Sequence, residues 1–495
     1  MSKPRSAPSG VQLPEGHTGS SFFHHVLLET AQAFPEVLGE AQLPSDPKRF
    51  KGQYADALVR FEAHRAASER RTEIARFLAQ RTQEQLRHVE GERTQPFLEH
   101  LAQAKPAATF ETHRFEGQPG LQPAVPFEGE VYRGAALSEL IERLHADHQM
   151  TTPALQALRW VIERAQADDG AIRLPGKRFA LLGAGAELAP TPLLLAAGAK
   201  VLWVDIHEPD ALRGDTSLAG ALCVAERARN LLTQPREIAA TIERFAEDEP
   251  VTVGMFAYAA GASQEWRLGA SMNGIVRSLP PALVEALALF VSPTTAANVL
   301  QEDADVAAQR LQSHPWWQSS LHAVGLLPTP GQLPLAEATV SRSIVSLQGL
   351  SYQAAQYVSK IASAESYAVH GLRFDASEAQ PVTVSANVAG ITRTRSLSHP
   401  LFEAAFVGAP KFGVRIFEPA TTRALSGLMV LHDLLNPQAP GAAARRFDSE
   451  RDKARALLSQ QIHGGIYNLP YALEPAIRAA AVIGMARKPG VLFGR

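Results

Sequence analysis

The sequence predicts an α/β protein built on a doubly wound parallel sheet, with a large helical region before the sheet and a helical extension after it. Two observations carry this prediction. From Arg178 onward, short apolar runs alternate with helical patterns, which is typical of a parallel sheet covered by helices on both faces. In addition, a glycine turn at Gly183 lies between one such run and a second run that ends in an acidic residue.

Six runs are the predicted strands of this sheet. Most are short, apolar and free of charge, as strands buried on both faces are. They are Phe179–Leu182, Val201–Val204, Val251–Tyr258, Ala286–Ser292, Val382–Val388 and Phe412–Phe417. The single cysteine, Cys223, falls in a predicted helix over Ser217–Leu232, where it is expected to be a core residue rather than a nucleophile.

The chain is too long for one ordinary domain, and its texture divides it into four segments. They are a polar, disordered arm (1–19), a helical N-terminal region (20–172), the sheet domain (173–437) and a helical C-terminal extension (438–495). An insertion at 301–339 interrupts the sheet domain and carries Trp316 and Trp317. These two rings either line an apolar pocket or pin the insertion to the core.

The helical N-terminal region includes a long charged pattern from Asp46 to Val89, whose sparse apolar residues predict one narrow buried stripe. Its basic run, formed by Arg65, Arg70 and Arg71, is interleaved with Glu and is predicted to be a solvated face. Further along, His145 and His148 have helical spacing but no matching ligand motif downstream. They are therefore predicted to be surface histidines, and no metal site is expected.

Composition excludes several classes of function. The net charge of −2 gives no basic field for nucleic acid, and no uncharged apolar run has the roughly 20 residues of a membrane helix. One cysteine excludes an internal disulfide, and the polar first residues do not form a secretory signal. The expected protein is cytoplasmic, acts on a small molecule without nucleic acid or membrane, and has helical regions through which it can form a homo-oligomer.

The turn at Gly183 indicates a Rossmann-like dinucleotide site. Gly183 and Gly185 allow a sharp turn and a close approach of phosphate, and a helix after the turn would aim its amides at that phosphate. Leu188 replaces the third glycine of the usual fingerprint, and the turn also contains Glu187. Asp205, 22 residues after Gly183, would accept hydrogen bonds from ribose hydroxyls, which favours NAD over NADP.

Later segments resemble the short-chain dehydrogenase/reductase family, over roughly residues 178–435. The run Val382-Thr-Val-Ser-Ala-Asn-Val-Ala-Gly-Ile-Thr-Arg-Thr394 resembles the sixth strand of that family and the loop after it, which contacts the nicotinamide. On this resemblance Gly390, Thr392 and Thr394 are cofactor-binding residues, with Ala389 in place of a proline. Tyr258-Ala-Ala-Gly261 resembles the Asn-Asn-Ala-Gly element of the family and makes Gly261 a further cofactor contact.

The same resemblance implies catalytic residues. Ser292 ends a predicted strand where the catalytic Ser of the family lies, and Asn273 falls in the helix that carries the family's Asn. The catalytic Tyr and Lys of the family are spaced Tyr-x-x-x-Lys, so that the ammonium group lowers the pKa of the phenol.

The helix that should carry this Tyr and Lys departs from the family spacing. Lys360 matches the catalytic Lys, but the residue four positions before it is Gln356. Tyr352 and Tyr357 lie eight and three positions before Lys360. On an α-helix these spacings differ from four by about 40° and about 100° of rotation. Either phenol therefore serves only if the helix is distorted.

The first hypothesis is an NAD(P)-dependent oxidoreductase that acts on an apolar carbonyl or alcohol beneath the Trp316–Trp317 insertion. The second is an S-adenosylmethionine-dependent methyltransferase, which also pairs a glycine turn with an acid at Asp205 and predicts a final antiparallel strand pair. The third is a cofactor-binding scaffold protein without catalysis, which the glutamine at position 356 favours.

Overall fold

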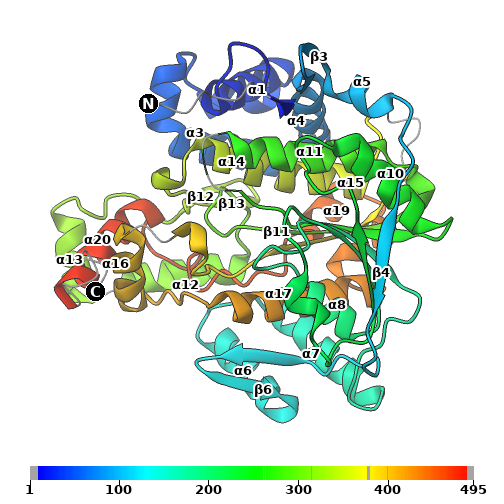
Figure 1. The fold of residues 1–495 in the computed structure, drawn as a ribbon. Coiled ribbons are helices and arrows are strands. Elements are labelled where there is room, and N and C mark those ends of the chain that lie inside the picture. The colour runs from blue at the N-terminus through cyan, green and yellow to red at the C-terminus, as the bar shows by residue number, and fades with distance from the viewer. Residues whose placement is uncertain are drawn as a thin grey trace, which may run out of the picture.

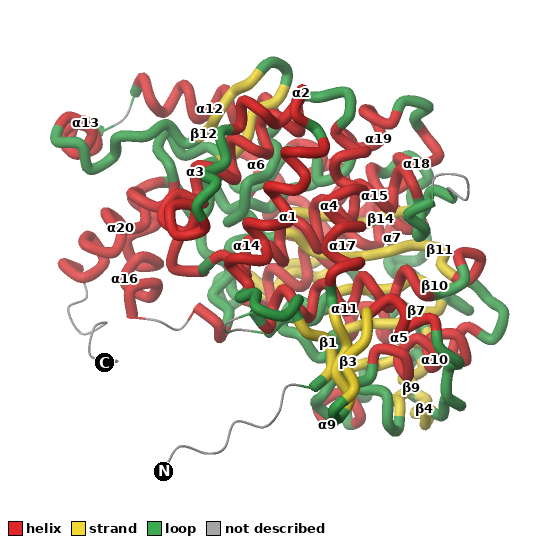
Figure 2. The backbone as a smooth tube through the Cα atoms, turned by 90° about the horizontal axis from the view of Figure 1, so that it is seen from above, coloured by secondary structure: helices red, strands yellow, loops and turns green. Residues whose placement is uncertain are grey.

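The computed structural model describes residues 9–259, 261, 263–313, 315–375, 380–397 and 400–487. It is a mixed α/β protein with a seven-stranded, mostly parallel sheet between layers of helices (Figures 1 and 2). From one edge to the other, the strands are β14 (Thr383–Val388), β11 (Val284–Val291), β10 (Val251–Met255), β7 (Arg178–Leu182), β8 (Lys200–Val204), β9 (Ala221–Ala225) and β4 (Phe110–Arg114). Neighbours pair in parallel except β4, which pairs antiparallel with β9.

The strands are buried on both faces, as their uncharged sequences predict. Along β7, Ala180 and Leu182 belong to one hydrophobic cluster, while Phe179 and Leu181 belong to another on the opposite face. Side chains of a strand point alternately to the two faces, so both clusters need covering helices. The two faces are covered by α10 (Pro235–Ala246), α11 (Gln264–Ser278) and α15 (Ser363–His370) on one side, and by α8 (Thr191–Ala196), α17 (Pro419–Leu435) and α7 (Thr152–Ala167) on the other.

A third layer of helices comes from the N-terminal region. In Figure 1, α1 (Gly19–Ala33), α3 (Pro47–Ala67) and α4 (Arg71–Gln85) lie outside α11 and α14 (Leu350–Gln356). Trp266 of α11 stacks on Phe22 of α1, with ring centroids 4.7 Å apart, and meets the edge of Phe23 at 5.8 Å. The N-terminal helices and one face of the sheet therefore share one hydrophobic core.

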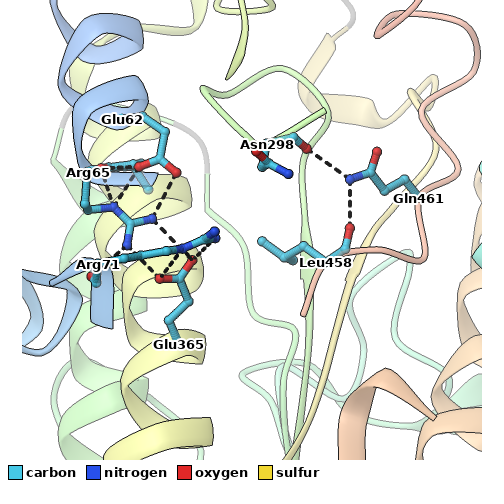
Figure 3. Close-up of polar contacts among 8 residues, drawn as sticks. Glu62, Arg65, Arg71, Asn298, Glu365, Leu458 and Gln461 are labelled. Carbon is cyan, nitrogen blue, oxygen red and sulfur yellow. Dashed lines mark hydrogen bonds and ion pairs between the residues drawn. The ribbon is translucent and has the colours of Figure 1, made fainter. Parts of the chain in front are cut away.

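A buried ion cluster joins this layer to the helix beneath it (Figure 3). Arg65 pairs with Glu62 at 2.7 Å and with Glu365 at 2.6 Å, and Arg71 pairs with Glu365 at 2.5 Å. The Tyr357 hydroxyl donates to Glu62 at 2.6 Å and completes what we call the ion cluster. The prediction of a solvated face is thus wrong for Arg65 and Arg71, which are buried because Glu365 lies opposite them. Arg70 is 43% exposed and pairs with Glu73.

Several other sequence predictions need correction. Cys223 is buried as expected, but it lies in β9 and not in a helix. No strand covers 412–417, because a 3₁₀-helix (Ala409–Phe412) ends there at Gly413, whose φ is +73°. Residues 1–8 lie outside the described residues, but Gly10–Gln12 of the predicted disordered arm form β1, which pairs with β2 (Arg87–Glu90). The helix predicted to reach Val89 ends at Gln85, because the following residues form β2 and pair with β1.

The remaining elements surround these layers. They are α2 (Pro35–Leu38), β3 (Arg93–Pro96), α5 (Phe97–Ala102), β5 (Ala124–Phe127), β6 (Glu130–Arg133), α6 (Gly134–Ala146), α9 (Asp210–Arg213), α12 (Gln301–Gln312), α13 (Trp316–Ala323), β12 (Gln332–Leu335), β13 (Ala338–Ser341), α16 (Pro400–Gly408), α18 (Ala443–Arg446), α19 (Glu450–Ala456) and α20 (Leu473–Arg487). No helix in the described part of the chain is long and apolar enough to cross a membrane.

The insertion and the C-terminal extension contact each other, since the Gln332 side chain donates to the Tyr467 backbone oxygen at 2.5 Å. In the insertion, Trp317 packs edge-on against Phe412, with centroids 5.3 Å apart, whereas Trp316 is 80% exposed. Trp317 therefore pins α13 to the core. In the extension, Gln461 donates to the backbone oxygens of Asn298 and Leu458 (Figure 3). The extension is thereby tied to the loop that follows β11.

Candidate functional site

The glycine turn after β7 is closed by backbone packing and by Asp205. Gly183 has a φ of +87°, and a Cβ built on it would lie 2.3 Å from the backbone of Ala257. Glycine is required there because the chain after β10 crosses directly over it. Asp205, which follows β8, accepts hydrogen bonds from the amides of Gly185 and His207, both at 3.0 Å. Gly185 is exposed and Asp205 is half-buried, so both remain accessible to a ligand.

The helix expected directly after the turn begins later than predicted. α8 starts at Thr191 and has only six residues, and the Thr191 hydroxyl donates to the Ala184 oxygen at 2.6 Å. The amides nearest the two glycines therefore belong to the turn and not to a helix. Within the turn, Leu188 is half-buried, and Glu187 pairs with Arg395 at 3.2 Å. This pair links the turn to the loop that follows β14.

The loop after β14 packs tightly against the chain before α17. A Cβ on Gly390 would lie 2.7 Å from the ring of Phe417. The buried Thr392 hydroxyl contacts the Gly390 oxygen at 2.7 Å and the Thr422 hydroxyl at 2.6 Å, and the Thr394 amide donates to the Thr392 oxygen at 2.9 Å. This loop is rigid at Gly390 and Thr392. At the end of β10, Gly261 is exposed and has a φ of +107°.

Ser292 and Tyr352 come together at the carboxyl end of β11. The Ser292 and Thr294 hydroxyls are 2.9 Å apart, and the Thr294 hydroxyl is 3.4 Å from that of Tyr352. Burial and the nearby Glu265 carboxylate raise the pKa of Tyr352, although bonds from Ser292 and Thr294 oppose this. The phenol therefore keeps its proton at neutral pH. The structure thus places two of the predicted catalytic residues, Ser292 and Tyr352, within one hydrogen-bonded group.

A π-helical turn, Tyr357–Ala362, aligns Lys360 with this group. A π turn takes up one more residue than an α turn, so the eight-residue separation of Tyr352 and Lys360 approaches two full turns. Gln356 lies between them, and its side chain spans two partners. It accepts from the Ser292 amide at 3.0 Å and donates to Glu265 at 3.4 Å.

Glu265 was not among the residues found from the sequence. It lies in the first turn of α11 and is 8% exposed. Burial raises its pKa to about 8, while burial lowers that of Lys360 to about 8, and each charge favours the other. Its signal in the sequence is faint: an acidic residue beside Trp266 in a helix with few charges. We call Glu265, Ser292, Tyr352, Gln356 and Lys360 the polar site.

Two predicted catalytic residues, Asn273 and Tyr357, make buried contacts away from the polar site. The Asn273 amide donates to the Gly269 and Ser359 oxygens, each at 2.8 Å, and Asn273 accepts from the Tyr367 hydroxyl at 2.7 Å. It thus holds the π turn against α11, because such a turn frees a carbonyl from the α-helical pattern. Tyr357 is buried in the ion cluster, where its hydroxyl also accepts from Arg65 at 3.1 Å.

An apolar pocket adjoins the polar site. It lies between α16, α20 and the loops after β11 and β14, and Thr294 is among its lining residues. The open space within it is about 40 Å³, which admits a few heavy atoms of a ligand. Its wall includes Ile391, Phe402, Phe406 and Phe412. A larger cavity of about 510 Å³ lies at the amino ends of the strands, whereas the polar site lies at their carboxyl ends.

One cluster has the residue types of a metal site but not the geometry. His88, Glu90 and His100 place ligand atoms within 4.8 Å of one another. However, the two imidazole rings are stacked, with centroids 3.6 Å apart and planes 10° from parallel. The nitrogen lone pairs lie in the ring planes, so parallel stacked rings do not converge on one ion. The other histidine pair is apart from this cluster: His145 contacts the Thr152 hydroxyl at 3.0 Å, and His148 is exposed.

Comparison with known proteins identifies no relative. No family model matches the chain, and no curated protein or solved structure is significantly similar to it.

Proposed function

We propose that this protein binds a nicotinamide dinucleotide across the carboxyl ends of its parallel strands and reduces an apolar carbonyl compound. The observation that carries the proposal is the polar site. It brings Ser292 and Tyr352 together at the end of β11, beside an apolar pocket, and the charge of Glu265 acts on both Tyr352 and Lys360. These are the residue types that carbonyl reduction by short-chain dehydrogenases would require.

The strand order supports a Rossmann-like fold. Taking β7, β8, β9, β10, β11 and β14 as strands one to six, the six parallel strands lie in the order 3-2-1-4-5-6. In such sheets, a dinucleotide binds where the order reverses, between the first and fourth strands. Gly183 and Gly185 follow β7, and Gly261 follows β10, so the predicted cofactor residues flank that point.

The residues of the chain fit the roles that the reaction demands. The bound nicotinamide would supply a hydride for the carbonyl carbon. Asp205 offers a carboxylate for ribose hydroxyls at the end of β8. Tyr352 keeps its proton at neutral pH, and its raised pKa differs from the lowered phenol pKa that the family resemblance implies. It would give up this proton only as negative charge develops on the carbonyl oxygen, with the Ser292 hydroxyl as a second donor. The apolar part of the substrate would lie along Ile391 and Phe402 in the pocket.

The methyltransferase hypothesis receives less support. It expects an antiparallel strand pair at the far end of the sheet, but β14 is the end strand and no described strand pairs antiparallel with it. The antiparallel strand is instead β4, at the opposite edge. The scaffold hypothesis rests on Gln356, which holds Ser292 and Glu265 and cannot itself exchange a proton as a phenol does.

The decisive experiment is a titration of the purified full-length chain with NADH and NADPH, followed by cofactor fluorescence. Asp205→Asn is expected to weaken NADH binding about 10-fold to 100-fold, because a charged hydrogen bond to ribose is lost. Asp210→Asn is the matched control, since Asp210 is exposed on α9. Absence of binding of either cofactor at millimolar concentration contradicts the proposal, and micromolar binding of S-adenosylmethionine in a calorimeter would favour the methyltransferase instead.

A further inference from the structure

Glu265 occupies an unusual position for a carboxyl group. It is almost fully buried, yet its hydrogen bond among the described residues comes from the neutral amide of Gln356. It is the first of three residues spaced four apart along α11, the others being Gly269 and Asn273. Residues with this spacing share one helix face. A Cβ on Gly269 would lie 2.9 Å from that of Ser359, so this face of α11 lies directly against the π turn.

The facing helix presents Tyr352, Gln356 and Lys360, which are also spaced four apart. Gln356 touches Glu265 directly, and the Glu265 charge acts on both Tyr352 and Lys360. The carboxyl group therefore faces the middle of this row. It accepts a hydrogen bond from Gln356, the residue at the position where the family spacing would put the catalytic Tyr.

We propose that Glu265 is a positioning residue that holds Gln356 across the polar site and acts as the counter-charge of Lys360, thereby setting which groups of the site carry a proton. This role deepens the proposed function and rests on it. It explains how a site with glutamine at position 356 keeps a charge on the half-buried Lys360. It also explains why the working phenol is Tyr352, one helical turn earlier.

The electrostatics of the site agree with this role. The Glu265 carboxylate raises the pKa of Lys360 and that of Tyr352, so its removal should lower both. The other titratable groups that act on Tyr352 or are acted on by it are Tyr258, on the loop after β10, and Tyr467, from the C-terminal extension. The pKa of Tyr467 is itself raised by burial, so this phenol is uncharged at neutral pH, and the charges that act on the site come from Glu265 and Lys360.

When two interacting groups titrate in the same pH range, their protons are released in two steps, and neither step can be assigned to one residue alone. Glu265 and Lys360 meet this condition, since the pKa of each is about 8. The polar site can therefore exchange a proton near neutral pH.

The test measures the pKa of Lys360 in the full-length chain without any cofactor. Lysines are reductively methylated with a ¹³C label, the Lys360 signal is assigned with Lys360→Arg, and it is followed from about pH 5 to about pH 11, a range that covers both groups. In Glu265→Gln the pKa of Lys360 is expected to fall by about one unit or more, because the counter-charge is lost. Glu265→Asp should retain most of the wild-type value.

The control and the wild type make the outcome decisive. Glu285 lies at the amino end of β11, opposite the end that carries Ser292, and pairs with Lys177. Glu285→Gln removes this carboxylate and should leave the Lys360 signal unchanged. An unchanged or raised pKa in Glu265→Gln overturns the inference. If that variant fails to fold, the wild-type curve decides: two steps support the inference, and a single step at the ordinary lysine value overturns it. Because this titration contains no cofactor, its result does not depend on NADH binding. A failure of NADH binding would contradict the proposed function and would be detected in the separate fluorescence titration.

Discussion

One helix, from Leu350 to His370, carries two polar clusters that differ in how their charges are matched. Toward the N-terminal helices, the ion cluster pairs every charge directly, with contacts of 2.5 to 2.7 Å between its arginines and carboxylates. Toward the sheet, the polar site holds the half-buried Lys360 and the buried Glu265, which act on each other's charge, but no direct ion pair of either is found among the described residues. One tyrosine belongs to each, Tyr357 to the first and Tyr352 to the second.

This difference in charge pairing suggests that the ion cluster stabilises the fold, whereas the polar site is suited to proton transfer. A fully paired cluster has its protonation states fixed far from neutral pH, as the lowered pKa of Glu365, about 2, illustrates. An unpaired cluster costs stability, because buried charges without partners are unfavourable. Such groups, with pKa values near neutrality, are the ones that a proton-transferring site needs. The contrast predicts that substitutions in the ion cluster change folding, whereas substitutions in the polar site change activity.

Breaking the ion cluster should have the largest effect. Arg65→Met leaves Glu62 and Glu365 buried without their shared partner, and the free energy of unfolding should fall by about 3–5 kcal/mol. Denaturant unfolding measures this loss. Arg81→Gln, which breaks only partly exposed pairs with Glu29 and Glu84, should cost less than about 1 kcal/mol. Equal losses in the two variants would mean that burial does not distinguish these pairs.

The two tyrosines offer the sharpest comparison. If the protein reduces carbonyls as proposed, Tyr352→Phe should lower kcat about 100-fold to 10,000-fold, because the proposed proton donor is lost, with little change in stability. Tyr357→Phe should cost about 1–3 kcal/mol of unfolding free energy, since Glu62 loses a buried donor, and should leave kcat nearly unchanged. Steady-state kinetics and denaturant unfolding of both variants check this. Loss of activity in Tyr357→Phe with retention in Tyr352→Phe would reverse the assignment.

The pH dependence of stability should follow the ion cluster. Arg65 and Arg71 lower the pKa of Glu365 to about 2 against burial, compared with its ordinary value of 4.5. A lowered folded-state pKa stabilises above the unfolded value, and this stabilisation is lost as pH falls from 4.5 through about 2. The stability difference between wild type and Glu365→Gln should therefore shrink over that window. A difference that stays constant between neutral pH and about pH 2 would contradict the charge pairing.

The smallest effect is expected at the insertion. Trp317→Ala should lower the free energy of unfolding by about 1–3 kcal/mol, because the ring packs against Phe412 in the pocket wall. It should also raise KM for apolar substrates. Trp316→Ala is the matched control, since its ring is 80% exposed, and should change neither quantity. Thermal unfolding and kinetics of the pair test whether the pocket depends on α13.

Sequence patterns predicted the sheet better than the site. Five of the six predicted strands are confirmed, because uncharged apolar runs between turns have few alternatives in a covered parallel sheet. β9 was missed because Ala221-Leu-Cys-Val-Ala225 is as compatible with a helix as with a strand. Its pairing with β8 and β4, which periodicity does not reveal, decides between them. Pairing with distant segments also overrode the local patterns at Gly10–Gln12.

In the site, residues adjacent to strands were easier to locate than residues on helices. Ser292 follows directly from the end of β11. The burial of Arg65 could not be predicted, since its partner Glu365 is 300 positions away. The π turn has no sequence signature, so the alignment of Tyr352 with Lys360 and the role of Asn273 beside it remained hidden. Glu265 was missed because a single acidic residue in a helix usually faces water.

The third layer of helices has a consequence for how the chain is made. α1, α3 and α4 are synthesised before the helix that they cover, which lies some 300 residues later in the sequence. During synthesis, Arg65 and Arg71 therefore lack their partner Glu365 until residue 365 has been added to the chain. In the same way, β4 lacks its pairing strand until β9 has been made. The N-terminal helices can therefore complete their buried ion pairs only after Glu365 has been synthesised.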